Sequence, residues 1–243
     1  MTAILQFKNI EKKYNDKAII KDFNLEIEQG EFLCMIGSSG SGKTTLLKMI
    51  NGLILPDHGS VLVNGKNIQE EDLITLRRSI GYCIQGSGLF PHMNVEENIS
   101  YVPNLWNKRD KQKTKAAVAK WMKIVGLSDE LRTRYPSELS GGQQQRVGIA
   151  RALAASPNIL LMDEPFGAVD EITRKQLQKE IKDIHQKTGI TIIFVTHDIN
   201  EALTLGTKIL VLDQGQIQQF APPKTIVEQP ANKYVERLLN GKT

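Results

Sequence analysis

The chain has 243 residues, of which 40% are hydrophobic and 24% charged, so it has the composition of an ordinary globular protein with a sizeable core. Its formal net charge of +4 does not require an anionic partner. Acidic and uncharged residues interrupt the basic run Asn107–Lys120, which favours a solvated helix face over a nucleic-acid surface. Neither a secretory pattern nor a long apolar span is evident, so we expect the chain to stay in the cytosol.

The first part of the chain predicts strands. Alternating apolar and polar residues indicate antiparallel strands joined by turns at Asn15-Asp16 and Gln29-Gly30. The run FLCMI then predicts a strand buried on both faces, and a short helix follows from Thr44 to about Asn51. The stretch SVLVNGKNI predicts a hairpin that turns at Asn64-Gly65.

After a further strand, IGYCI, the pattern changes. From about Leu89 to Glu138 the sequence is helical and charged, with expected breaks at Pro91, Pro103 and Pro136. Cys34 and Cys83 lie in short apolar runs without a CxxC pair, so we expect buried reduced thiols.

A strand–helix–strand rhythm then returns, which implies a parallel sheet. It comprises the strand ILLMD, a helix that ends at Gly189, the strand ITIIFVT and the closing hairpin KILVLDQGQIQ.

The stretch GSSGSGKT, residues 37–44, matches the phosphate-binding P-loop pattern and lies between a predicted strand and a predicted helix. Its glycines allow a tight turn, so that backbone N–H groups and the helix N-terminus face phosphates. Lys43 is expected to bridge the β- and γ-phosphates, and the Thr44 hydroxyl to ligate Mg²⁺. The spacing and context together make a chance Gly/Ser loop a poor alternative.

Two carboxylates end the later strand ILLMD. Strand side chains alternate, so Asp163 and Glu164 are expected to point to opposite sides at the carboxyl edge of the sheet. We assign Asp163 to the magnesium shell and Glu164 to the general base that polarises a water molecule. By itself such a pair is more often a helix cap, but the P-loop reverses that preference.

Two more polar residues follow predicted strands. His197 comes after ITIIFVT, and parallel strand order would bring it to the same sheet edge, where it can donate to the γ-phosphate. Only its position argues against a structural role. Gln85 follows IGYCI, and its amide could touch the metal or the attacking water.

A second anion-binding feature lies in LSGGQ, residues 139–143, where a serine and two glycines open a helix. The P-loop, the glutamine after a strand, LSGGQ, ILLMDEP and the later histidine, in this order and spacing, resemble the ATP-binding subunit of an ABC transporter. The resemblance covers essentially the whole chain. It implies that two such chains pack head to tail on ATP binding, with each LSGGQ covering the nucleotide on the partner's P-loop.

The resemblance also implies site residues. Tyr14, which by itself would be a surface or core residue, is expected to stack on adenine. Catalysis is expected to use Glu164, His197 and Gln85, and magnesium to contact Thr44, Gln85 and Asp163. The remaining expected ATP contacts are Gly37, Ser38, Ser39, Gly40, Ser41, Gly42, Lys43, Thr44 and Thr45 within the chain, and Ser140, Gly141, Gly142, Gln143 and Asp170 across the dimer.

For the fold, we expect an α/β chain with a P-loop NTPase core and a mainly parallel sheet. An N-terminal antiparallel β subdomain and an inserted α-helical subdomain complete it. The resemblance implies that residues 1–243 form one ABC ATPase domain, with the core at 1–88 and 157–243 and the helical subdomain at about 89–156. The tail after VLDQGQIQQF has room for a helix but not for the paired regulatory domains that some family members carry.

Partners and cargo follow from the resemblance alone. The implied partners are integral membrane permease subunits and an extracytoplasmic solute-binding protein, with the chain at the cytoplasmic face of the cell membrane. The segments LFPHMNVEENI and DEPFGAVDEITRKQLQ resemble importers of glycine betaine, choline and carnitine. The apolar loop residues Leu89, Phe90, Pro91 and Met93 fit either core packing or a permease docking groove.

Three alternatives remain. One is an importer of polar amino acids or another small solute. The second is a non-transport ATPase acting on nucleic acid or on protein machinery, which the absence of sustained heptads, of a cysteine cluster and of a second cassette disfavours. We therefore expect no nucleic-acid partner. The third is an exporter, which only the likeness to importers disfavours.

Overall fold

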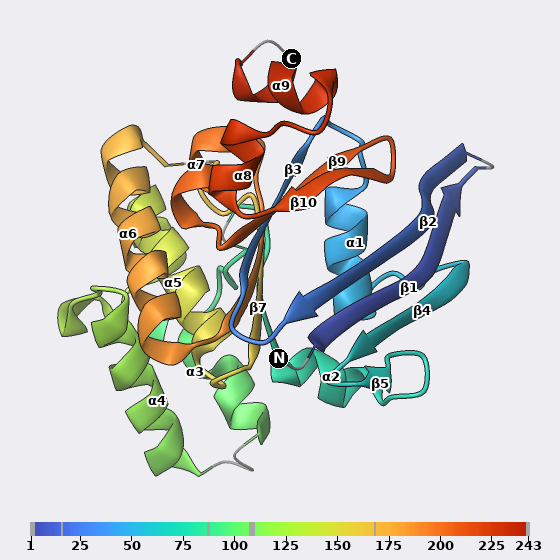
Figure 1. Ribbon diagram of the computed structural model, residues 1–243. Coiled ribbons are helices and arrows are strands. Elements are labelled where there is room, and N and C mark those ends of the chain that lie inside the picture. The colour runs from blue at the N-terminus through green and yellow to red at the C-terminus, as the bar shows by residue number, and fades with distance from the viewer. Residues whose placement is uncertain (1–2, 16, 87, 107–109, 168, 242–243) are drawn as a thin grey trace. The chain divides into compact units, whose positions relative to one another are not determined.

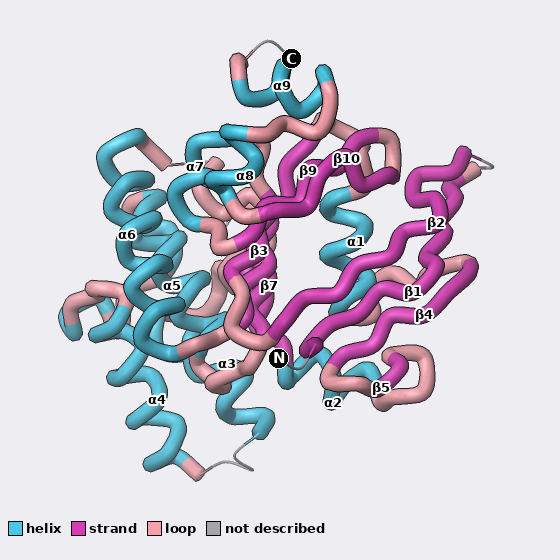
Figure 2. The backbone as a smooth tube through the Cα atoms, viewed as in Figure 1, coloured by secondary structure: helices cyan, strands magenta, loops and turns pink. Residues whose placement is uncertain are grey.

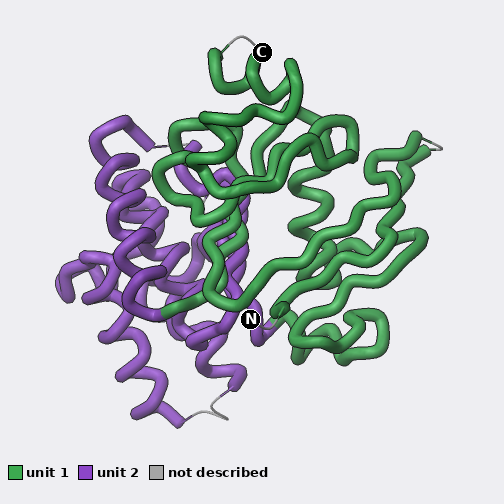
Figure 3. The backbone as a smooth tube through the Cα atoms, viewed as in Figure 1, with its two compact units in different colours: residues 1–77, 189–243 green, residues 78–188 purple. Residues whose placement is uncertain are grey.

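The computed structural model describes residues 3–15, 17–86, 88–106, 110–167 and 169–241. The chain forms two compact units, coloured in Figure 3. Unit 1 comprises residues 1–77 and 189–243, and unit 2 comprises residues 78–188. The expected subdomain boundaries near 88 and 157 both lie inside unit 2. The reason is that the strands at residues 80–83 and 159–163 and the helix at residues 171–188 belong to the same compact unit as the inserted helices.

Unit 1 begins with the expected antiparallel sheet, shown in Figure 2. Its strands run in the order β2-β1-β4-β5. The turn between β4 and β5 falls at Asn64-Gly65, where both residues have positive φ, as a tight hairpin requires. Phe7 and Phe23 meet edge to face at 5.3 Å between ring centroids. The strand bounds are β1 (Ala3–Tyr14), β2 (Lys17–Glu28), β4 (His58–Val63) and β5 (Lys66–Asn67); Asp16 of the expected first turn lies outside the described residues.

The second sheet region of unit 1 is mainly parallel. Strand β3 (Phe32–Gly37) is buried throughout and pairs in parallel with β8 (Thr191–Val195) and β9 (Lys208–Asp213). Strand β10 (Gln216–Ala221) closes it antiparallel to β9. Helix α1 (Lys43–Ile50) contacts β3, β8 and β4, so it lies between the two sheet regions (Figure 1). These contacts fix the loop from β3 to α1 on a rigid base.

Short helices complete this part of the chain. Helix α7 (Ile199–Leu205) begins at its N-cap Asp198, whose carboxylate accepts from the backbone N–H of Asn200 at 2.8 Å. The expected helical tail is present and packs against β10. The other helices are α2 (Leu73–Ser79), α8 (Pro223–Glu228) and α9 (Lys233–Leu239).

Unit 2 combines a parallel strand pair with helices. Strand β6 (Ile80–Cys83) pairs with β7 (Ile159–Asp163). An ion pair joins two helices of the unit, because Arg146 of α5 (Gly141–Leu153) lies 2.6 Å from Glu180 of α6 (Glu171–Thr188). The helices are α3 (Val95–Trp106), α4 (Lys111–Ile124), α5 (Gly141–Leu153) and α6 (Glu171–Thr188), with short 3-10 turns η1 (Asp129–Leu131) and η2 (Pro136–Glu138).

One predicted helix break is wrong. Helix α3 continues through Pro103 to Trp106. Proline has no N–H to donate to the carbonyl four residues earlier, but Pro103 is buried, and α3 packs against both α4 and α5. Tertiary packing therefore outweighs the local cost here, whereas Pro136 begins η2, a position that suits proline.

The described part of the basic run is confirmed as a solvated helix face. Asp110 caps α4 by accepting from the N–H groups of Gln112 and Lys113, each at 3.1 Å, and most of the following lysines are exposed. Residues 107–109 lie outside the described residues. Within the described ranges, no helix has both the length and the apolar character needed to cross a bilayer.

Both cysteines are buried free thiols, as expected. Burial raises the pKa of Cys83 to about 12 and raises the pKa of Cys34 well above its ordinary value. A thiol reacts as the thiolate, so burial and a raised pKa both lower the reactivity of these two cysteines.

We therefore expect neither thiol to react with 5,5′-dithiobis(2-nitrobenzoic acid) at pH 8 in the folded protein. Both should react within minutes in 6 M guanidinium chloride, followed as absorbance of the released thiolate. Rapid labelling of one thiol without denaturant would contradict the buried placement of that residue.

Candidate functional site

The loop between β3 and α1 has the backbone of a phosphate cradle. Gly37, Gly40 and Gly42 all have positive φ. A Cβ on Gly37 would lie 1.9 Å from the backbone oxygen of Leu212, so only glycine fits against the end of β9. Gly42 is the N-cap of α1 and offers no side chain to its first N–H groups, which suits a helix end that receives an anion.

Lys43 is buried against this loop. Its ammonium donates to the backbone oxygens of Gly37 at 2.8 Å and of Ser38 at 2.9 Å. These two bonds hold the Lys43 ammonium at the centre of the loop. A phosphate that reaches the loop therefore meets a fixed cation together with the helix N-terminus.

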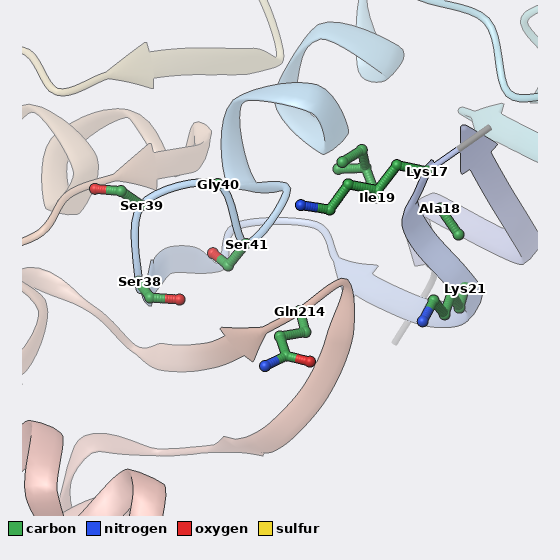
Figure 4. A pocket seen from close by; sticks show the side chains of 9 residues that line it. All are labelled: Lys17, Ala18, Ile19, Lys21, Ser38, Ser39, Gly40, Ser41 and Gln214. Atoms are coloured by element: carbon green, nitrogen blue, oxygen red, sulfur yellow. The ribbon is translucent and has the colours of Figure 1, made fainter. Parts of the chain in front are cut away.

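A pocket of about 500 Å³ opens beside the loop within unit 1 (Figure 4). This volume falls in the range of small-molecule sites. The side chain of Lys17 extends towards the loop. The pocket is lined by Lys17, Ala18, Ile19, Lys21, Ser38, Ser39, Gly40, Ser41 and Gln214.

Tyr14 lies at the end of β1, with its Cα opposite that of Lys17 in the β1–β2 ladder. Because Lys17 lines the pocket, this pairing puts Tyr14 near the pocket's edge. Tyr14 is 43% exposed. Lys12 lies 5.6 Å from the ring centroid.

His197 follows β8 and lies at the same sheet edge as the start of the P-loop. In the parallel β3–β8 ladder Met35 pairs with Val195, which places Gly37 and His197 at corresponding positions beyond the pair. The exposed His197 lies between the buried Thr196 and the cap residue Asp198, whose N–H donates to the Thr196 hydroxyl at 3.0 Å. The backbone on both sides of the imidazole is thus fixed.

In unit 2, the two adjacent carboxylates have different environments. Asp163 ends β7 and is 7% exposed, whereas Glu164 is partly exposed and has a φ of +45°. The extended strand therefore stops at Asp163, and strand alternation cannot fix the direction of Glu164 as the sequence argument assumed. Burial, together with the Asp163 charge, raises the pKa of Tyr82 on neighbouring β6 to about 12.

Gln85 contacts Glu164, the second of these carboxylates. Its side-chain amide donates to a carboxylate oxygen of Glu164 at 3.3 Å. Gln85 lies two residues beyond the end of β6 and is exposed. The structure thus brings Gln85, Asp163 and Glu164 together at the carboxyl ends of a parallel strand pair.

The LSGGQ segment forms the start of α5. Ser140 is its N-cap, and its hydroxyl accepts from the N–H of Gln143 at 3.3 Å, while the Gln143 side chain accepts from the N–H of Ser140 at 2.9 Å. This capping box orders the helix start. Ser140 and Gly141 are exposed, so the segment is available to another molecule.

Asp170 caps the next helix, α6. Its carboxylate accepts from the hydroxyl and the N–H of Thr173, at 2.7 and 3.0 Å, and these bonds lower the pKa of Asp170. A Cβ on Gly142 would lie 2.6 Å from the methyl group of Thr173. The second glycine of LSGGQ thus allows the starts of α5 and α6 to approach closely.

The apolar loop before α3 is ordered by hydrogen bonds from a buried side chain of that helix. The fully buried Asn98 donates to the backbone oxygens of Phe90 and Met93 and accepts from the Phe90 N–H at 2.9 Å. The Phe90 ring packs 4.9 Å from that of Tyr101. Pro91 is exposed, and Leu89, Phe90 and Met93 are partly exposed, so the loop is ordered without being fully buried.

Sequence reasoning missed several residues around the P-loop. Asp213, Gln214 and Tyr234 come from the end of β9, the hairpin turn and α9, and each contacts the loop or lines its pocket. The Gln214-Gly215 turn is visible in the sequence as part of a hairpin. Its position beside the P-loop depends on the pairing of β9 with β3, which no local signal reveals.

The expected metal donors suit Mg²⁺, because hydroxyl and carboxylate oxygens such as those of Thr44 and Asp163 are hard ligands. Among the described residues there is no group of three or more His, Cys, Asp or Glu side chains that could hold a metal.

A protein-family model described as "ABC transporter" matches residues 20–167, more than half of the chain. The chain belongs to the ABC transporter family. The ABC cassette MJ0796, solved as a dimer in a post-hydrolysis state bound to ADP and phosphate, is similar to it with a TM-score of 0.80 and 33% identity. That alignment covers 90% of this chain and 98% of the solved one.

Two curated relatives with high identity are named as transport ATP-binding proteins. The carnitine transport ATP-binding protein OpuCA of Listeria monocytogenes is 50% identical over 96% of this chain. The glycine betaine/carnitine/choline transport ATP-binding protein OpuCA of Bacillus subtilis is 48% identical over 97%. This ABC chain spans 59% and 62% of those two relatives, respectively.

The P-loop of this ABC family member should be far less tolerant at Gly37 than at Gly40. Alanine at Gly40 meets no atom within 4 Å and pays only the left-handed backbone cost of about 1–2 kcal/mol. Alanine at Gly37 also displaces the Leu212 carbonyl, which adds about 1–3 kcal/mol. Urea unfolding of both variants checks this, and equal midpoints would contradict the close approach.

Proposed function

We propose that this chain is the ATP-hydrolysing subunit of a membrane ABC importer. The observation that carries the proposal is the P-loop, with Lys43 buried against its carbonyls and a pocket of about 500 Å³ beside it. The fixed cation and the helix N-terminus favour an anionic ligand, and the pocket has room for the rest of a nucleotide. Membership of the ABC transporter family supports ATP as that nucleotide.

In this proposal each residue has one task. Lys43 and the N–H groups of the loop bind the β- and γ-phosphates, and Tyr14 stacks on adenine. His197 donates to the γ-phosphate. Mg²⁺, when bound, neutralises phosphate charge and would be held by Thr44 and Asp163, with Gln85 beside it. The remaining P-loop contacts are Gly37, Ser38, Ser39, Gly40, Ser41, Gly42 and Thr45.

Glu164 is the proposed general base. Its partly exposed carboxylate can accept a proton from water, and the Gln85 amide holds one carboxylate oxygen. The contact supports a sensing role, because any movement of the segment after β6 changes the orientation of the base. Gln85 thereby connects the hydrolysis step with the ordered apolar loop that follows it.

The exposed start of α5 supports a role across a dimer. Two chains would pair head to tail, with Ser140, Gly141, Gly142 and Gln143 covering the partner's nucleotide and Asp170 at the same interface. The similar MJ0796 cassette is itself dimeric. ATP binding would close the pair, and hydrolysis would open it, which supplies two states to a membrane partner.

Replacing Glu164 with Gln tests the base and the dimer together. The amide keeps the shape of the side chain but cannot take the proton, so ATP hydrolysis should fall by about 10²-fold or more. ATP should then hold the variant as a dimer in multi-angle light scattering. Glu228→Gln, on the exposed face of α8, is the matched control and should behave as wild type.

A monomeric Glu164→Gln protein at high concentration and saturating ATP would contradict ATP-driven pairing of the isolated chain. Retention of wild-type hydrolysis would instead remove Glu164 from the role of base.

We further propose quaternary-ammonium osmoprotectants, such as glycine betaine, choline and carnitine, as the transported class. Support comes from the identity of 48–50% to ATP-binding proteins named for carnitine, betaine and choline transport. The chain would act at the cytoplasmic face of the membrane, bound to permease subunits, with a solute-binding protein as part of the wider system. The ordered loop Leu89–Met93 is the proposed contact with the permease.

Uptake measurements distinguish this cargo from polar amino acids. Source cells carrying Glu164→Gln should lose accumulation of labelled betaine, choline or carnitine when other importers of these solutes are deleted, whereas amino-acid uptake should be unchanged. Cells carrying Glu228→Gln serve as the control. Unchanged osmoprotectant uptake would contradict the cargo and leave the ATPase proposal standing.

A further inference from the structure

Ser38, the second residue of the P-loop, has all its polar groups bonded within unit 1. Its hydroxyl donates to the carboxylate of Asp213 at 2.8 Å, and its carbonyl accepts from Lys43 at 2.9 Å. Its backbone N–H donates to the hydroxyl of Tyr234 at 2.9 Å. Tyr234 belongs to α9, so the start of the nucleotide loop is tied to the end of the chain.

The hairpin turn that follows Asp213 holds the loop at a second point. The backbone N–H of Gly215 donates to the carbonyl of Ser41 at 3.1 Å. The same turn lies against β2, because a Cβ on Gly215 would be 2.0 Å from the backbone oxygen of Ile19. The loop is therefore held at Ser38 by Asp213 and by α9, and at Ser41 by the hairpin turn.

Contacts other than the Tyr234 hydroxyl also hold helix α9 in position. Asn232 caps it by accepting from the N–H groups of Tyr234 and Val235, at 3.0 and 3.1 Å, and donates to Gln218 of β10 at 2.9 Å. Val235 is completely buried. The segment before the helix is fixed by Gln219, which bonds the backbone of residues 229 and 231.

We propose that Tyr234 is a positioning residue for nucleotide binding, which acts through the Ser38 N–H and couples α9 to the P-loop. The bond fixes the peptide between Gly37 and Ser38, where the loop leaves β3. A loop whose first peptide is fixed presents its later N–H groups already oriented, so less order is lost on binding. This inference rests on the proposed nucleotide-binding function of the same loop.

The coupling is reciprocal. If docking of α9 strengthens nucleotide binding, bound nucleotide must stabilise the docking of α9 by the same factor. Any molecule that draws α9 away from β10 would therefore weaken nucleotide binding, although it touches neither the phosphates nor the base.

The test uses the full chain and ATP. Tyr234→Phe keeps the ring and removes one hydrogen bond, which should raise the Kd and the KM for ATP about 2- to 10-fold. The kcat should stay within about twofold, because no reacting atom is touched. Arg237→Gln is the matched control, since the one hydrogen bond of that guanidinium within the described ranges goes to a carbonyl of its own helix, and it should leave both constants unchanged.

A second variant separates positioning from simple stability. Asn232→Ala removes the α9 cap and should raise the Kd in the same direction. In the double variant with Tyr234→Phe the two effects should not add, because both act through one contact. Hydrogen exchange at α9 should slow when ATP binds to wild type, and this slowing should shrink in Tyr234→Phe.

An unchanged ATP affinity in Tyr234→Phe, with wild type binding normally, would overturn the inference and leave the proposed function intact. Additive effects in the double variant would also overturn it. Failure of wild type to bind ATP would instead contradict the proposed function itself, so the two failures are distinguished by the protein in which they occur.

Discussion

The close approach of the P-loop to the end of β9 is the constraint on which the site depends. Gly37 lies against the Leu212 carbonyl with no room for a Cβ, and Asp213, one residue further, bonds the Ser38 hydroxyl. That approach exists because β9 pairs in parallel with β3. The strand pairing brings the hairpin turn beside the loop, where the N–H of Gly215 in that turn donates to the carbonyl of Ser41. The conformation of the phosphate-binding loop thus depends on contacts with β9 and the hairpin turn as well as on its own glycines.

Much of the fold could be predicted because its signals are local. The buried run of β3, the positive-φ turns at Asn64-Gly65 and the glycine that ends α6 each follow from the residues at those positions. Pro103 shows where local reasoning fails, since packing of α3 against α4 and α5 outweighs a missing hydrogen bond. Whether a helix continues through an unfavourable residue depends on tertiary packing as well as on local propensity, and the sequence shows only the local propensity.

The candidate site divides in the same way. The P-loop and the carboxylates at Asp163 and Glu164 are predictable because each is a short motif at a strand end. The contact of Gln85 with Glu164, and the contact of Tyr234 with Ser38, join residues distant in sequence and need the strand order. Asp170 has a structural task as the cap of α6, so its presence in the sequence does not by itself indicate a ligand contact.

The positive φ of Glu164 lowers the stability of the folded chain, although the side chain at this position is the proposed base. A side chain larger than glycine in the left-handed region costs about 1–2 kcal/mol, and glycine at this position would recover part of that energy, because glycine also gains freedom in the unfolded chain. Glycine would also delete the carboxylate that we propose as the base. A laboratory selection for heat resistance alone would therefore favour loss of this side chain, whereas growth that requires the intact carboxylate retains it. Engineering of a more robust variant should hold position 164 fixed and look for gains elsewhere.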